Sequence, residues 1–187
     1  MGLFEPYRHR LMDEERMPAL TDLRIRPALL DDLAELGEIE AAREGGKAAD
    51  YASKFERAIT SWNATGQGLV LVAQHGGRLV ALAKVSHFTP PNEAPANIAP
   101  PGWYLSGLIA VPEYRRRGIA RTLTGARLSW IRERDSRAFY FSNLRNQASI
   151  ELHREFGFVE LTRNFTYPGA TFEGGIGVLF RAEFQKE

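Results

Sequence analysis

Apolar residues recur along the chain with two different periods, and these periods predict the elements of a mixed α/β domain. Helical spacing is found in residues 29–42, 49–62, 118–133 and 146–156. Short apolar or alternating runs indicate strands at residues 23–26, 68–74, 78–87, 102–111, 137–142, 158–165 and 175–184. A hairpin signal, His75-Gly76-Gly77, lies beside strand–helix–strand connections, and this combination implies a mixed sheet.

The same pattern predicts a single domain with a short appendage. Residues 1–22 are polar, contain Pro6 and Pro18, and are expected to form an N-terminal extension, whereas residues 23–187 form the domain. Residues 90–101 hold five of the ten prolines and predict a long, stiff loop. We therefore expect one α/β domain with a mixed, mostly antiparallel sheet flanked by helices.

Composition narrows the function classes. The chain has 187 residues, 44% of them hydrophobic, and no cysteine. The absence of cysteine excludes disulfides, thiolate nucleophiles and iron–sulfur clusters, and no metal site is predicted. Because no apolar run approaches the length of a membrane span, and residues 1–10 lack a signal-peptide core, a soluble cytoplasmic protein with no membrane partner is expected.

Charge is concentrated in one segment. The formal net charge is +1, but residues 115–137 contain eight arginines and two acids, a net of +6, which leaves −5 for the rest of the chain. Such a local basic patch favours one anionic ligand bound at one place, although an arginine-rich, solvated helix face would look the same. A single basic helix without an aromatic platform does not indicate a nucleic-acid partner.

The segment Leu108–Thr122, LIAVPEYRRRGIART, carries the strongest chemical signal. An apolar strand runs through Pro112 into an arginine-rich turn and then into a helix, whose first N–H groups lack helical acceptors. Gly118 and the small Ala120 allow the backbone to approach a ligand closely. The segment thus suits an anion such as a pyrophosphate. Neither a Walker A loop nor a G-x-G-x-x-G fingerprint is present.

Two motifs in this part of the chain resemble those of the GNAT-type N-acetyltransferase superfamily. R-x-x-G-x-A, from Arg115 to Ala120 after L-x-x-V-P-E-Y, is similar to the family's acetyl-CoA-binding motif. N-x-x-S-x-x-L-H-x-x-x-G-F, from Asn146 to Phe158, is similar to its second helix motif. The predicted order of helices and strands over residues 23–184 is also similar to that of this family. The resemblance implies a GNAT-like fold and acetyl-CoA as the cofactor.

The resemblance also implies a cofactor site. Two parallel strands, here those ending at Val111 and Ser142, would diverge around the pantetheine, and a bulge at Gly107 would free an N–H for the thioester carbonyl. Backbone amides of the turn would hold the pyrophosphate, with the guanidinium groups second in importance. The implied cofactor-binding residues are Ile109, Ala110, Val111, Arg116, Arg117, Gly118, Ile119, Ala120, Arg121, Asn146 and His153.

Acid–base residues are harder to place. His153 stands where the family usually has the tyrosine that protonates the departing thiolate, so the resemblance implies that His153 is the general acid. A surface histidine is the alternative. The positions where members often carry a base are Tyr104 and Phe141, neither of which is a carboxylate. We expect deprotonation through ordered water, with Tyr104, Ser106 or His87 as the relay; alternatively, Tyr104 is a packed strand residue.

The acceptor would be bound by parts of the chain outside these motifs. Acids and aromatics suit a cationic amine, which points to Asp50, Tyr51, Phe55, Glu56 and Glu173. Alternatively, the aromatics among these residues belong to the core and the acids are solvated surface charges. The leading hypothesis is direct acetyl transfer to a primary amine of a small molecule, such as an amino sugar or aminoglycoside-like compound, a polyamine or an amino acid. A protein N-terminus or lysine, and a non-catalytic acyl-CoA sensor, remain alternatives; the resemblance also admits a homodimer.

Overall fold

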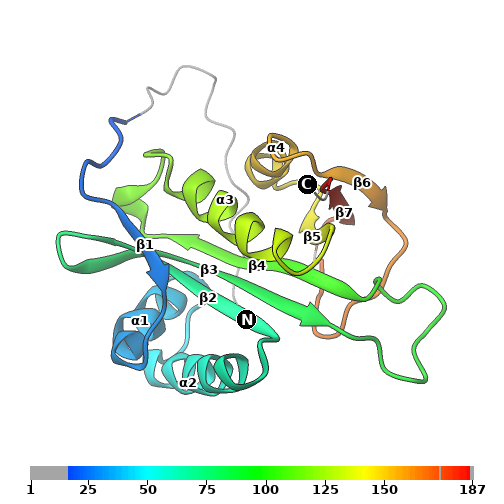
Figure 1. The fold of residues 1–187 in the computed structure, drawn as a ribbon, viewed down its shortest axis with the longest axis horizontal. Coiled ribbons are helices and arrows are strands. Elements are labelled where there is room, and N and C mark those ends of the chain that lie inside the picture. The colour runs from blue at the N-terminus through cyan, green and yellow to red at the C-terminus, as the bar shows by residue number, and fades with distance from the viewer. Residues whose placement is uncertain (1–16, 173, 186–187) are drawn as a thin grey trace. The chain divides into compact units, whose positions relative to one another are not determined.

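The computed structural model describes residues 17–172 and 174–185, and this part of the chain contains four α-helices and seven strands (Figure 1). In chain order the elements are β1 (Arg24–Pro27), α1 (Leu33–Glu44), α2 (Ala48–Thr65), β2 (Gly68–His75), β3 (Arg78–Phe88), β4 (Gly102–Ala110), α3 (Ile119–Arg132), β5 (Arg137–Asn143), α4 (Gln147–Arg154), β6 (Val159–Thr162) and β7 (Gly177–Glu183). The predicted extension, residues 1–22, lies largely outside the described residues.

The strands form one sheet in the order β1-β2-β3-β4-β5-β7-β6. β4 and β5 are parallel, with Tyr104 opposite Phe139, whereas β1–β2, β5–β7 and β6–β7 are antiparallel. This topology confirms the mixed sheet flanked by helices that the hydrophobic pattern predicts. None of the helices in the described part of the chain is long and apolar enough to cross a membrane.

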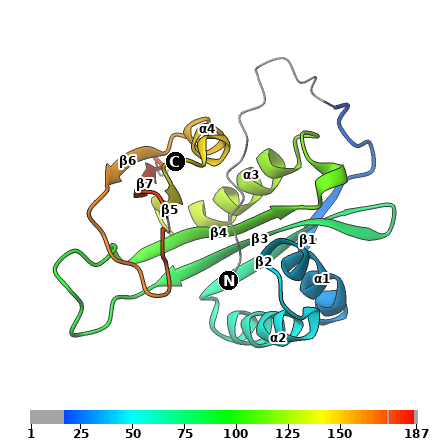
Figure 2. The same cartoon turned by 180° about the vertical axis from the view of Figure 1, so that it is seen from behind.

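The chain divides into two compact units, and the first contains residues up to 85 together with residues 107–127. Within this unit α1 and α2 lie on one face of the strands and the start of α3 on the other (Figures 1 and 2). The α1–α2 face is built on Leu36, Phe55, Ile59, Val72, Leu82 and Ile109. Ile119 and Leu123 of α3 pack on Leu71, Ala81 and Ala83 from the other side. The amphipathic helices therefore cover both faces of these strands.

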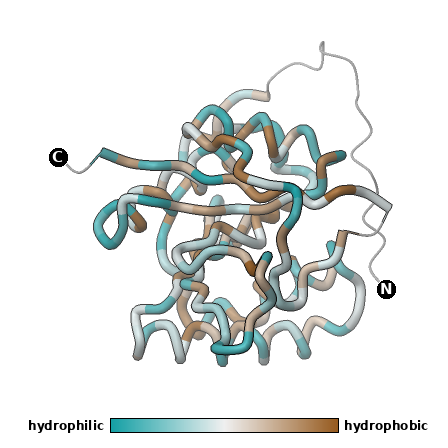
Figure 3. Tube along the Cα trace, turned by 90° about the vertical axis from the view of Figure 1, so that its right-hand side faces the viewer, coloured by the Kyte–Doolittle hydropathy of each residue, from teal (hydrophilic) through white to brown (hydrophobic). Residues whose placement is uncertain are grey.

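The second unit, residues 86–106 and 128–187, has an aromatic core. Tyr104, Phe139 and Leu179 are buried and contact Phe88, Phe141, Phe165 and Tyr167. Tyr140 of β5 stacks on Phe180 of β7, with ring centroids 4.7 Å apart. Hydrophilic and hydrophobic residues are interspersed along the trace (Figure 3). Ring packing thus dominates this unit.

Two predicted boundaries are wrong for physical reasons. The expected helix 29–42 begins later, at Leu33, because Asp32 first closes a 3-10 turn by accepting a hydrogen bond from the Leu29 N–H at 2.7 Å. The guanidinium of Arg26 donates two hydrogen bonds to the same carboxylate, at 2.7 and 2.8 Å, and holds its pKa below the usual value. Asp32 therefore fixes where the helix starts.

The second wrong boundary concerns the predicted strand 158–165. The observed strand β6 covers only Val159–Thr162, and its register against β7 shifts between Glu160 and Thr162. Beyond the strand, Phe165 leaves the ladder and contacts Phe141 and Phe172. Burial of this ring in the aromatic core outweighs continued strand pairing.

Candidate functional site

The connection from β4 to α3 forms a backbone cradle in the first unit. A 3-10 turn, Pro112–Tyr114, follows β4, and α3 begins at Ile119. The Thr122 N–H donates to the Gly118 carbonyl at 3.0 Å, which is the first helical hydrogen bond. The N–H groups of Ile119 and Ala120 therefore belong to the first turn and have no acceptor inside the helix. With the positive end of the helix dipole, they favour an anion.

The turn before α3 is built from left-handed residues. Gly118 has φ 79°, and a Cβ added there would meet no atom within 4 Å. Arg116 has φ 66° and is the one non-glycine residue with positive φ among those the structure describes. That conformation costs an L-residue roughly 1–2 kcal/mol, so the turn is held in shape at the expense of local strain. Space and donors together fit a pyrophosphate.

The arginines of this turn differ in hydrogen bonding and in exposure. The Arg115 Nε donates to the Ala110 carbonyl at 3.1 Å and ties the turn to the end of β4. Arg117 is half-buried, and its Nε is enclosed with no hydrogen-bond partner among the described residues. Arg116 and Arg121 are exposed. A phosphate oxygen is a natural acceptor for the Arg117 guanidinium.

The apolar residues predicted to contact the cofactor have buried or half-buried side chains. Ile109 and Ile119 are buried in the two apolar clusters of the first unit. The Val111 N–H donates to the Val80 carbonyl at 2.9 Å, so it is already used by β3. Ala110 and Ala120 are half-buried. The buried side chains of Ile109 and Ile119 and the Val111–Val80 hydrogen bond therefore anchor the two ends of the turn in the core.

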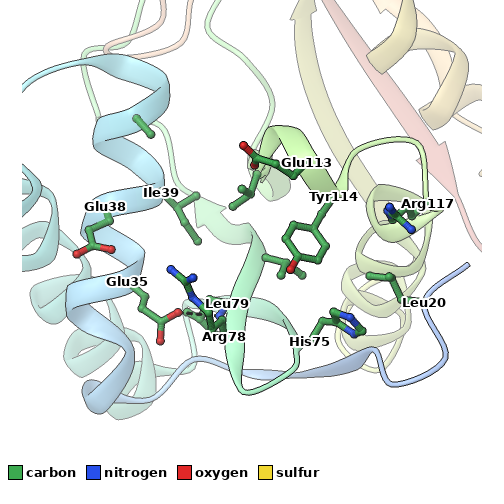
Figure 4. A pocket seen from close by; sticks show the side chains of 13 residues that line it. Leu20, Glu35, Glu38, Ile39, His75, Arg78, Leu79, Glu113, Tyr114 and Arg117 are labelled. Carbon is green, nitrogen blue, oxygen red and sulfur yellow. Dashed lines mark hydrogen bonds between the residues drawn. The ribbon is translucent and has the colours of Figure 1, made fainter. Parts of the chain in front are cut away.

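A cavity of about 770 Å³ adjoins this turn, and sequence reasoning did not find it. Glu35 and Glu38 of α1 lie on one side, and Tyr114, Arg117 and His75 on the other (Figure 4). The Nδ1 of His75 is enclosed without a hydrogen-bond partner in the described part of the chain. Acidic and basic side chains thus line opposite sides of this cavity, an arrangement that suits a ligand carrying both a positive and a negative charge. Arg117 belongs both to this cavity and to the cradle.

A second group of polar residues gathers at Gly107, in the middle of β4. Gly107 has φ 54°, so the strand leaves its extended conformation at the position where the sequence predicts a bulge. A side chain at residue 107 would collide with Lys84 of β3. The Lys84 Nζ is 3.1 Å from Oε1 of Glu40 and 5.3 Å from the centre of the Phe55 ring.

Neither Lys84 nor Glu40 is among the predicted site residues. Both side chains are largely buried, with exposed fractions of 24% for Lys84 and 13% for Glu40. A signal did exist: Lys84 interrupts the apolar strand RLVALAKVSH, and Glu40 follows the buried Leu36 by four residues, on the same face of α1. A charge on a buried face needs a partner, which here lies 44 residues away.

The predicted acceptor-binding residues separate into two groups. Phe55 is buried on α2 and contacts Lys84. Asp50 and Glu56 are exposed on the same helix, and the half-buried Tyr51 carries the Lys54 ammonium over its ring at 4.8 Å. Glu173 lies outside the described residues. Of these predicted positions, Phe55 is thus the one found beside the Gly107 group.

His153, predicted as the general acid, lies in the second unit inside the aromatic core. Asn146 caps α4 as predicted, because its side chain accepts a hydrogen bond from the Ser149 N–H at 3.3 Å. The His153 ring is only 3% exposed and stacks on Tyr140 with centroids 3.8 Å apart. Its Nδ1 lies 2.7 Å from the Ser149 carbonyl and so carries the proton of the neutral ring. The ring is thus packed against Tyr140 and Phe158 and is shielded from solvent.

Tyr104, predicted as a proton relay, is also a packed residue of the second unit. It is 1% exposed, stacks on Phe139 at 5.2 Å, and donates its hydroxyl proton to the Pro100 carbonyl at 2.7 Å. Burial raises its pKa well above the ordinary tyrosine value. The phenol is therefore a hydrogen-bond donor that ties the proline-rich loop to β4, which matches the packed-strand alternative.

Known structures share this fold. A ribosomal-protein-alanine N-acetyltransferase from Brucella melitensis is 24% identical, with a TM-score of 0.67, over 86% of this chain and 99% of that protein. YncA from Salmonella typhimurium, solved with its cofactor acetyl-CoA, is 17% identical with a TM-score of 0.66, over 88% and 95%. PaiA N-acetyltransferase from Thermoplasma acidophilum, in complex with coenzyme A, is 17% identical with a TM-score of 0.61, over 87% and 99%.

The sequence itself matches a family model. No curated protein matches the chain closely enough to count as a relative. The model of the acetyltransferase (GNAT) family, however, matches residues 33–158, more than half of the chain, and includes both the β4–α3 cradle and the Gly107 group. The motifs, the fold and this match agree, and the chain therefore belongs to the GNAT family of acetyltransferases.

Proposed function

We propose that the protein is an acetyl-CoA-dependent N-acetyltransferase that acts on a primary amine of a small molecule. The observation that carries this proposal is the cradle between β4 and α3, where a strained turn leads into a helix start and Gly118 faces open space. The fit to a pyrophosphate rests on these backbone donors and on the arginines around them. Acetyl-CoA, when bound, supplies an acetyl group activated as a thioester.

The protein's part in the reaction is to bind and to position. The N–H groups of Ile119 and Ala120 would hold the pyrophosphate, and Arg117 would add a charged donor. The peptide group at Gly107 would polarise the acetyl carbonyl, because the backbone there is turned out of the extended conformation. The amine attacks directly, since the chain has no cysteine to form a covalent intermediate. His153 and Tyr104 take no part in this mechanism.

A protein N-terminus is the second candidate acceptor. The Brucella melitensis neighbour is a ribosomal-protein-alanine N-acetyltransferase, and its fold matches over most of this chain. The largely buried position of Glu40 and Phe55 beside Gly107 favours a slender primary amine, which both a small molecule and a chain terminus present. The cytoplasmic location and the homodimer expected from the sequence stay predictions.

Release of coenzyme A tests the proposal directly. The purified protein is given acetyl-CoA and a panel of polyamines, amino sugars, amino acids and peptides with a free N-terminus, and free thiol is read with a thiol-reactive dye. The chain contributes no background, because it contains no cysteine. We expect thiol release with at least one small amine. Release with peptides alone selects the second candidate; cofactor binding without release for any amine overturns catalysis and leaves an acyl-CoA sensor.

A further inference from the structure

Lys84 places a primary amine against the bend in β4. A Cβ built on Gly107 would lie 2.9 Å from the Lys84 Nζ, so the ammonium rests directly on this glycine. The backbone of Lys84 is fixed as well, since its carbonyl accepts a hydrogen bond from the buried Arg127 guanidinium at 3.4 Å. Strand β3 thus delivers an amine to the peptide that, under the proposed function, polarises the acetyl carbonyl.

The surroundings of this amine are those expected of an acceptor site. Oε1 and Oε2 of Glu40 lie 3.1 and 3.5 Å from Nζ. The ring of Phe55 lies 5.3 Å from the same nitrogen, within the range of a cation–π contact. A carboxylate that can accept a proton and an aromatic ring that holds the cation are therefore already in place around a side chain of the protein itself.

We propose that Lys84 is an internal acceptor and that the protein acetylates it. The proposal rests on the proposed function, because the acetyl group must come from acetyl-CoA held at Gly107. Glu40 takes a proton from the Lys84 ammonium, and the neutral amine attacks the thioester carbonyl. The new N–C bond forms as the C–S bond breaks, and coenzyme A leaves as a thiolate. The second proton of the amine leaves the nitrogen as the amide forms and passes through water to this thiolate. Lys84 ends as neutral Nε-acetyl-lysine.

This modification changes the acceptor site. Acetylation removes the positive charge of Lys84 and so leaves the Glu40 carboxylate without its cation. A largely buried carboxylate of this kind attracts another cation. The acetylated enzyme therefore presents Glu40 and Phe55 to the ammonium of an incoming amine, and Lys84 acetylation precedes efficient turnover of that amine.

Site-resolved mass spectrometry tests the proposal. The full-length protein, first treated with a lysine deacetylase, is incubated with acetyl-CoA and no other amine, and acetylation of each lysine is followed with time. Lys54 is the matched internal control, because its ammonium also lies over an aromatic ring, at 4.8 Å, but on an exposed residue away from Gly107. We expect Lys84 to be modified at least about tenfold faster than Lys54, since it is held beside a base.

A cofactor-free measurement separates transfer from chemical acetylation. With a small amine-reactive acetylating reagent in place of acetyl-CoA, the order should reverse, because Lys84 is shielded and Lys54 is exposed. Glu40→Gln should slow the acetyl-CoA reaction at Lys84 by about 100-fold, the loss expected for a general base. The same variant should speed reagent labelling of Lys84, because the ion pair is gone. Lys84→Arg keeps the charge and serves as the folding control.

The outcomes separate this proposal from the proposed function. If the protein binds acetyl-CoA, as read by a thermal shift, and acetylates an added amine while Lys84 reacts no faster than Lys54, then the internal acceptor is wrong and the proposed function stands. If acetyl-CoA does not bind, both fail. Faster Lys84 acetylation that is unchanged in Glu40→Gln also overturns the proposal, since the carboxylate would then have no part in the step.

Discussion

The two units of the molecule treat polar groups in opposite ways. In the first unit the β4–α3 turn is open, with Gly118 facing space and with arginines around a helix start. In the second unit the hydroxyl of Tyr104 and the ring of His153 are buried among stacked aromatic rings. Both sets of residues follow motifs of one family. From their environments we infer that the first set can reach a ligand, whereas the second set is packed inside the protein.

The difference shows that a side chain at a family motif position can act in catalysis only if it can also reach a ligand. A histidine or a tyrosine can move protons only where the group can reach a substrate and change its charge state. In the second unit burial raises the pKa of both Tyr104 and Tyr140. In the first unit the free-energy cost of burying a charged group is offset by pairing, as where the Lys84 ammonium contacts the Glu40 carboxylate. We expect substitutions in the two units to affect different measurements.

The largest effect on stability is expected in the second unit, from Phe139→Ala. Phe139 is 2% exposed and stacks on Tyr104. Loss of a buried ring leaves a cavity and should lower the free energy of unfolding by about 3–5 kcal/mol, measured by denaturant titration. Phe165→Ala is the matched control, because this ring is only half-buried at the rim of the same cluster. Equal losses in the two variants would contradict an aromatic core centred on Phe139.

In the first unit, Gly118→Val should act on binding. A β-branched residue does not tolerate φ 79°, and its side chain would fill the space above the turn. We expect a loss of about 100-fold in acetyl-CoA affinity by calorimetry, close to 2.7 kcal/mol. Gly66→Val introduces the same strain at φ 68° in open space at the end of α2. That control should lower stability while acetyl-CoA affinity stays unchanged; a loss of affinity in it would show that strain alone is responsible.

Tyr104→Phe probes the relay role in the second unit. The variant loses the hydrogen bond to the Pro100 carbonyl and should lose about 1 kcal/mol of stability. Because the raised pKa keeps the phenol protonated, the pH–rate profile should match that of the parent between about pH 6 and 9, below the ordinary tyrosine range. If the variant is as stable as the parent but its pH–rate profile lacks an ionisation that the parent shows, then Tyr104 is a proton relay.

The smallest effect is expected from Arg116→Gly. Glycine adopts φ 66° without strain but has more conformational freedom in the unfolded chain, so the two contributions largely offset each other. We expect stability to rise by about 0.5–1 kcal/mol in denaturant titration. Arg121→Gly lies within α3 and should instead lose about 1 kcal/mol. A loss of stability in Arg116→Gly would mean that the arginine side chain, and not the backbone, holds the turn.

Much of the fold could be predicted because its signals are local. Helical and strand periods placed every helix and strand, and Pro112 and Gly118 marked the strand–turn–helix segment around which the cradle forms. The start of α1 was wrong because Asp32 closes a preceding turn, and β6 is shorter because Phe165 joins the aromatic core. These errors come from contacts that no period along the chain encodes.

The candidate site was only half predictable for the same reason. The cradle lies within one continuous segment, whereas Lys84 and Glu40 are 44 residues apart and meet only when α1 packs on the sheet. The burial of His153 likewise depends on Tyr140 and Phe158, which come from two other segments. A family motif therefore pointed to the proposed anion site, but the side chains that surround the Lys84 amine could be identified only from the tertiary structure.

Amide hydrogen exchange with and without acetyl-CoA shows whether backbone N–H groups at the start of α3 hold the cofactor. We predict that acetyl-CoA slows exchange at residues 116–121, together with residues near Gly107, and that Gly118→Val abolishes this protection. Saturating acetyl-CoA that leaves exchange at residues 116–121 unchanged, while it protects another segment, would contradict the account.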